Sequence, residues 1–250
     1  MRRDWPRLFL SGSGQPNVRA NNVIVRARAI HFAALVSVAA LVWVGQSDGA
    51  GQASSGAYKP LSSLGHLQPA PYAGKLGPEL TPIPNAPLLA EPASAATPTK
   101  SIDGIKCEGM ERMVFHIHAH LVVVVNGKYR VIPYGVGIGP PLRGENTKAG
   151  AFVTQGSCFS WTHTHAADGI IHLEGPAERT YTLGEFFDIW GQPLSANEVG
   201  PAHGAVTAIV NGMVYTGDPR QIPLLKHAQI QLEVGRPLIA PVTIKFYGSL

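Results

Sequence analysis

This 250-residue chain has few cysteines and no nucleotide-binding signature. Its net charge is close to zero outside the N-terminal segment. Residues 1–28 carry six arginines against one aspartate, a net charge of +5, while the whole chain carries +4. Residues 29–250 therefore carry −1, which excludes a basic stripe for the phosphates of a nucleic acid. The glycine-rich stretch 135–156 lacks the Lys-Ser/Thr ending of a phosphate-binding loop. We expect neither a nucleic acid nor a nucleotide as a partner.

Cysteine is limited to Cys107 and Cys158. Outside the cytoplasm a lone pair of this kind usually forms a disulfide, which here would join the segments that lead into two histidine-rich stretches. The alternative is that Cys158, five residues before His163, is a thiolate ligand of a metal. No methionine follows these two residues in one loop, which argues against a blue-copper site.

The arginine-rich segment 1–28 precedes an uncharged, largely apolar run at 29–47. As a helix this run would extend ~28 Å, close to the hydrocarbon thickness of a bilayer. Positive charge before the run predicts that 1–28 is cytoplasmic, that 29–47 is a transmembrane signal-anchor, and that the remainder is extracytoplasmic. The alternative is a cleaved signal peptide and a secreted protein.

Proline, alanine, glycine and serine dominate residues 48–100. The prolines argue against long helices and long hydrogen-bonded ladders, so this stretch is expected to be a flexible to semi-stiff linker. Residues 101–250 are the part expected to build a packed core, as one extracytoplasmic domain.

The sequence of this domain predicts several strands and a single helix. Thr182 and Glu185 form a capping box, which predicts a helix that ends before Gly191. Asn-Gly pairs at 126–127 and 211–212 predict tight hairpin turns. The predicted strands are 114–125, 129–134, 206–210, 213–216, 227–234 and 242–247. The expected class is α+β, mainly antiparallel strands with one capped helix packed on the sheet in a β-grasp-like order; the alternative is a β-sandwich.

Three histidines alternate along the first predicted strand: His116, His118 and His120. Alternate residues of a strand share a face and lie ~6.5–7 Å apart, so two neighbouring imidazoles can reach one ion. Residues four apart are separated by twice that distance. We therefore expect one histidine of the three to serve a different partner.

A second stretch holds His163, His165 and His172 on either side of an Asp168-Gly169 turn signal. Closing a hairpin around Ala167 and Asp168 places His163 opposite His172, and His165 opposite Ile170. The three histidines then share one face and converge on a metal. Glu174 shares this face as a candidate ligand or orienting carboxylate, and Asp168 is a second candidate for the orienting role.

Imidazole suits both copper and zinc, and the nearby Met110 and Met113 favour copper slightly unless they are core residues. The first hypothesis is therefore a membrane-tethered, extracytoplasmic protein that binds copper or zinc for metal handling or sensing. The second is a three-histidine metalloenzyme, a hydrolase or hydratase, and the third is an envelope interaction module without metal. No protein partner follows from the sequence.

The motifs at 115–120, 161–172 and 181–193 together resemble an uncharacterised family of bacterial membrane-anchored or exported proteins. The resemblance covers roughly residues 101–250. It implies that the motifs occur together, and it implies no activity.

Overall fold

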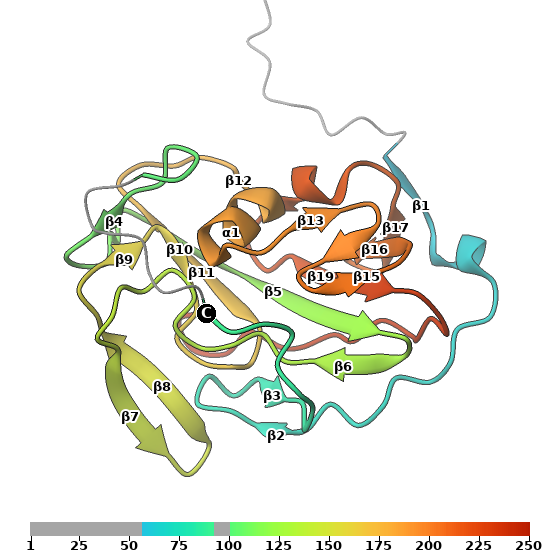
Figure 1. Cartoon of the computed structure of the whole chain (residues 1–250), viewed down its shortest axis with the longest axis horizontal. Helices are drawn as coiled ribbons and strands as arrows, with labels where there is room; N and C mark the ends of the chain where they lie inside the picture. Colours follow the sequence, from blue (N-terminus) through green and yellow to red (C-terminus); the bar gives the residue numbers. More distant parts are fainter. Residues whose placement is uncertain (1–56, 93–100) are drawn as a thin grey trace, which may run out of the picture. The chain divides into compact units, whose positions relative to one another are not determined.

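The computed structural model describes residues 57–92 and 101–250 (Figure 1). The predicted cytoplasmic segment 1–28 and signal-anchor 29–47 lie outside these residues. Within the described part of the chain, no helix has the length and hydropathy needed to cross a membrane.

One mixed sheet forms the centre of the fold. Its two central strands, β5 (Phe115–Val125) and β19 (Gln229–Val234), are parallel, and every other pair of neighbours is antiparallel. The remaining strands are β10 (Thr162–His163), β11 (Ile170–Gly175) and β6 (Lys128–Arg130) on the β5 side, and β16 (Val206–Val210), β17 (Met213–Tyr215) and β1 (Tyr58–Pro60) on the β19 side. The predicted α+β class, mainly antiparallel strands with a helix, is therefore confirmed.

Shorter elements surround this sheet. The antiparallel pairs are β2 (Lys75–Leu76) with β3 (Pro82–Ile83), β4 (Cys107–Glu108) with β9 (Phe159–Ser160), β7 (Arg143–Thr147) with β8 (Gly150–Gln155), and β12 (Tyr181–Thr182) with β18 (Pro223–Leu224). The strands β13 (Leu194–Ser195), β14 (Glu198–Val199) and β15 (Ala202–His203) form a small sheet, and η1 (Leu61–Leu64) and η2 (Pro219–Gln221) are 3-10 turns. The β7–β8 hairpin occupies much of the predicted loop 135–156.

The helix α1 (Leu183–Trp190) begins and ends where the sequence predicts. The Thr182 hydroxyl accepts a hydrogen bond from the Glu185 backbone N–H, and the Glu185 carboxylate accepts one from the Thr182 N–H. Gly191 adopts the left-handed conformation that ends the helix. The buried face of α1 packs in one core with the odd-numbered residues of β5. This core leaves the even-numbered residues of β5, including its histidines, on the opposite face of the sheet.

Both predicted Asn-Gly turns are present. Asn126 and Gly127 have φ of 51° and 73°, and Asn211 and Gly212 have φ of 49° and 77°. Positive φ at both central residues is the requirement of a type I′ turn.

The linker prediction is wrong for residues 57–92, which pack against the domain. β1 is an edge strand paired with β17, and Leu89 is buried in the main core. The Glu91 carbonyl accepts a hydrogen bond from the indole N–H of Trp190. Proline prevents long ladders within such a segment, but it does not prevent extended chain from docking on an existing sheet, and edge strands tolerate it.

Residues 242–247 form no strand, contrary to the prediction. The backbone N–H groups of Val242 and Ile244 instead donate to the side-chain oxygens of Gln231 and Gln229, at 2.9 and 2.7 Å. Polar side chains of β19 therefore bind this segment across a face of the sheet.

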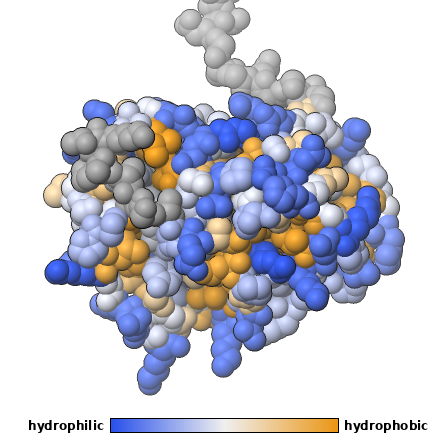
Figure 2. Space-filling model, viewed as in Figure 1, coloured by the Kyte–Doolittle hydropathy of each residue, from blue (hydrophilic) through white to orange (hydrophobic). Residues whose placement is uncertain are grey.

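Figure 2 shows hydrophobic residues (orange) between hydrophilic ones (blue) on the surface of the molecule.

Candidate metal centre

The register of three neighbouring strands brings the two histidine stretches together. His172 of β11 lies opposite His118 of β5 on one side and opposite His163 of β10 on the other. Glu174, two residues along β11, lies opposite His116. Directly opposed residues share a face, so these five side chains project from the same side of the sheet.

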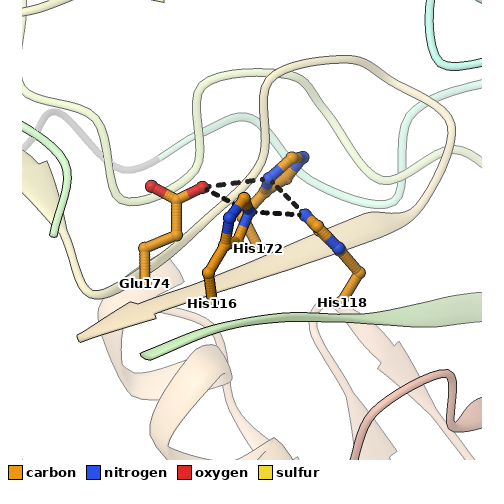
Figure 3. A group of neighbouring side chains, drawn as sticks. All are labelled: His116, His118, His172 and Glu174. Carbon is orange, nitrogen blue, oxygen red and sulfur yellow. Dashed lines mark hydrogen bonds and ion pairs between the residues drawn. The ribbon is translucent and has the colours of Figure 1, made fainter. Parts of the chain in front are cut away.

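The first group contains His116, His118, His172 and Glu174, whose side chains converge in Figure 3. His116 Nε2 lies 3.0 Å from His118 Nε2 and 3.2 Å from Glu174 Oε1. His172 Nδ1 lies 3.1 Å from His118 Nε2 and 3.3 Å from the same Glu174 oxygen. Each of the four ligand atoms therefore has two others within 3.0–3.3 Å.

The second group contains His163, His165, His172 and Glu174, and all four are buried. The Nε2 atoms of His163 and His165 are 3.1 Å apart. His163 lies opposite His172 as expected, but β10 ends at His163, so His165 does not pair with Ile170. Instead the His165 backbone carbonyl accepts a hydrogen bond from the Val153 N–H, which ties His165 to the β7–β8 hairpin.

Backbone carbonyls orient the rings of the second group. His163 Nδ1 lies 2.8 Å from the Ser160 carbonyl oxygen, and His165 Nδ1 contacts the Val153 carbonyl oxygen. A carbonyl only accepts, so each Nδ1 carries the proton and donates it. The Nε2 lone pairs are then free and point at each other, which is the tautomer that a metal ligand requires.

Two carboxylates that the sequence did not identify border this centre. Glu79 Oε1 lies 2.8 Å from His172 Nε2, and Glu111 Oε1 lies 3.5 Å from His165 Nε2. Glu79 belongs to the proline-rich stretch that composition assigns to a linker. Neither residue has a spacing that relates it to the histidines, so no local signal in the sequence could have found them.

Burial controls the protonation of the histidines. It lowers the pKa of His116, His163 and His165, and it lowers that of His118 to about 3. These rings are therefore neutral at neutral pH, with lone pairs available to a cation. His172 differs: burial opposes its charge, but hydrogen bonds to Glu174 and Glu79 outweigh burial and raise its pKa to about 9.

His120 belongs to neither group. Its Nε2 lies 3.1 Å from the Asp168 carbonyl oxygen, and burial lowers its pKa to about 4. The Asp168 carboxylate accepts a hydrogen bond from the Ile170 backbone N–H and so supports the turn that Gly169 completes at a φ of 82°. One histidine of the first row thus serves a different partner, as its spacing predicts.

The predicted disulfide between Cys107 and Cys158 is confirmed, with a Cα–Cα distance of 5.3 Å. It joins the first residue of β4 to the residue before β9, ahead of the two histidine stretches. Because both sulfurs are in the bond, the alternative of Cys158 as a thiolate ligand is overturned.

The histidine groups open onto a cleft of about 370 Å³. Its lining includes Glu79, Glu111, Met113, His116, His165 and Phe152. The Phe152 ring stacks on His165 with ring centroids 5.0 Å apart. A buried histidine–glutamate cluster that could hold a metal ion therefore lies in a cavity large enough for a small ligand.

No protein-family model, curated protein or solved structure matches this chain. The functional argument therefore rests on the geometry and chemistry of the centre.

Proposed function

We propose that this chain is a membrane-tethered, extracytoplasmic protein that binds copper or zinc through its histidine cluster, for metal handling or sensing. The observation that carries the proposal is the closed set of ligand atoms on His116, His118, His172 and Glu174, with neighbours 3.0–3.3 Å apart.

These separations match the coordination sphere of a small divalent ion. Nitrogen ligands at ~2.0–2.1 Å from an ion are ~3.3 Å apart in a tetrahedron and ~2.9 Å apart in a square plane. The observed 3.0–3.3 Å lies between these two values, the first typical of zinc and the second of copper(II).

Two further observations favour a binding role and, slightly, copper. Met110 and Met113 are 67% and 58% exposed, so they are not core residues, and Met113 lines the cleft beside His116 and His118. Thioether sulfur is a soft ligand that suits Cu(I). An exposed methionine in the lining of the cleft, Met113, fits a protein that receives or passes on copper.

The location proposed for this domain rests on three features. The apolar run 29–47 follows an arginine-rich segment, which is the pattern of a signal-anchor with a cytoplasmic N-terminus. The Cys107–Cys158 disulfide is the bond expected of an oxidising compartment. The resemblance to bacterial exported proteins supports the same extracytoplasmic location.

The cleft supports a second candidate function, a hydrolytic or hydrating metal centre. Glu111 lies at the cleft, and burial and then the charge of Glu174 raise the pKa of its carboxyl. A carboxylate of raised pKa beside a metal-bound water is a suitable general base. An exchangeable metal-bound water, detected by proton relaxation of the loaded protein, would favour this reading over simple metal handling.

The deciding experiment is elemental analysis of the detergent-solubilised full chain after exposure to equimolar copper and zinc. We expect at least one ion per chain in the wild type and a loss of one ion per chain in His118→Ala/His172→Ala. His203→Ala is the control, because that side chain is exposed and belongs to neither group. A folded wild type without metal would overturn the proposal and leave the non-metal envelope module.

A further inference from the structure

The two ligand groups lie on opposite sides of one strand. β11 is the middle strand, with the His116 and His118 side chains on β5 at one side and His163 on β10 at the other. His172 and Glu174 belong to both groups because they project between these neighbours. The His172 ring is nearly parallel to the His163 ring, at 12°, with centroids 5.4 Å apart.

The carboxylate of Glu174 faces both ligand groups, one on each side of β11. Its Oε1 is the oxygen that approaches His116 and His172 in the first group. Its Oε2 is 4.0 Å from His163 Nε2 and, among the described residues, has no hydrogen-bond partner although it is buried. An unpaired buried carboxylate oxygen is costly, and a cation bound next to it removes that cost.

The β10 side of β11 offers its own set of metal-ligand atoms. His163 Nε2 and His165 Nε2 have free lone pairs 3.1 Å apart, directed by the carbonyl contacts of their Nδ1 atoms. Glu111 Oε1 lies 3.5 Å from His165 Nε2 and supplies a second carboxylate. Five imidazoles and two carboxylates exceed the four ligands that zinc or copper usually takes from protein, so one ion cannot use them all.

We propose that the centre holds two transition-metal ions bridged by Glu174. The first ion is bound by His116, His118, His172 and Glu174 Oε1. The second is bound by His163, His165, Glu174 Oε2 and Glu111. Two-metal sites of this kind place their ions ~3.5–4 Å apart. This inference rests on the proposed function, since it requires that the cluster binds metal at all.

The test uses the full chain in detergent, loaded with Cu(II), with bound copper measured by elemental analysis. We expect two ions per chain in the wild type. The double variants His116→Ala/His118→Ala and His163→Ala/His165→Ala should each retain one ion, a twofold loss. Because each variant keeps the opposite site, its remaining ion also reports that the protein is folded.

Electron paramagnetic resonance tests the bridge itself. Two Cu(II) ions a few ångströms apart couple and give a half-field transition, which a single Cu(II) does not give. We expect this transition in the wild type and its loss in both double variants and in Glu174→Gln. The matched control is Glu233→Gln, a buried carboxylate whose two oxygens accept hydrogen bonds from Gln231 and Ile239, away from both groups.

The outcomes separate the two proposals. One copper per chain in the wild type, without a half-field transition, would overturn the two-ion centre and leave the proposed function intact. Two ions without coupling would overturn the Glu174 bridge. No bound copper or zinc would overturn both proposals.

Discussion

The ring of His172 and the carboxylate of Glu79 meet although 93 residues separate them in the sequence, with Nε2 and Oε1 2.8 Å apart. This contact orients His172 so that its Nδ1 faces His118 and Glu174. A carboxylate behind a metal-binding imidazole fixes its orientation and increases its basicity.

Glu79→Gln should therefore weaken metal binding without removing a proposed ligand. We expect a loss of affinity of about tenfold or more, the usual effect of replacing such an orienting carboxylate. Competition with a chromogenic chelator measures the affinity. Glu91→Gln is the control, because Glu91 lies in the same segment with an exposed side chain. Equal affinities of Glu79→Gln and wild type would contradict the orienting role.

Bound metal should stabilise the folded state, because an unfolded chain presents no assembled site. At a free metal concentration a hundredfold above Kd, the free energy of unfolding should rise by about 2.7 kcal/mol. Thermal unfolding with metal and with a chelator measures the difference. The same comparison in His118→Ala/His172→Ala, which removes two ligands of the first group only, should show a smaller shift, and a full shift there would place the stabilising metal elsewhere.

Removal of the disulfide should destabilise the domain strongly. Cys107 and Cys158 are 51 residues apart, and chain-entropy models assign about 3–4 kcal/mol to a loop of this length. Cys107→Ser/Cys158→Ser should unfold at a correspondingly lower urea concentration. The variant should also be insensitive to reductant, whereas reductant should destabilise the wild type. A wild type unaffected by complete reduction would contradict this prediction.

The acid stability of the helix region should depend on the Asp188–Arg220 ion pair, which links α1 to η2. Burial opposes ionisation of Asp188, but hydrogen bonds to Arg220 and Asp103 together with the charge of Arg220 outweigh burial, and the pKa of Asp188 is lowered from 3.8. A carboxyl whose pKa is lower in the folded state stabilises the fold above its unfolded pKa. That contribution disappears as the pH falls below 3.8 through the folded pKa.

Arg220→Ala should therefore be less stable than wild type at pH 7. We expect about 0.5–1 kcal/mol, a modest effect because both side chains are partly exposed to solvent. Urea unfolding at several pH values measures it. The difference should shrink as the pH drops below the unfolded pKa of Asp188, and a difference that grows in acid would have the wrong sign.

Local patterns predicted much of this fold because their causes are local. The capping residues Thr182 and Glu185 lie within one helical turn of each other, so their hydrogen bonds follow from spacing alone. The alternation of His116 and His118 places both on one face for the same reason. The opposition of His163 and His172 required only a turn near Asp168.

The errors have a common cause in contacts between distant segments. Residues 57–92 read as a linker because their composition disfavours internal structure, yet their partners are β17, Val131 and His172. His165 does not form the predicted hairpin pair with Ile170, because it binds Val153 of β8 instead. The sequence pattern predicts a loop where β8 lies.

Local sequence patterns were enough to predict which residue types are available to a metal, the face of β5 that carries them, and the pairing of Cys107 with Cys158. Packing between distant segments places β11 between the other two histidine strands, so that His172 and Glu174 face both groups. It also decided that Glu79 and Glu111 approach the cluster and that His120 turns to the Asp168 carbonyl. Strand periodicity depends on backbone geometry within a few residues, whereas these contacts depend on how separate segments pack against the same face of the sheet.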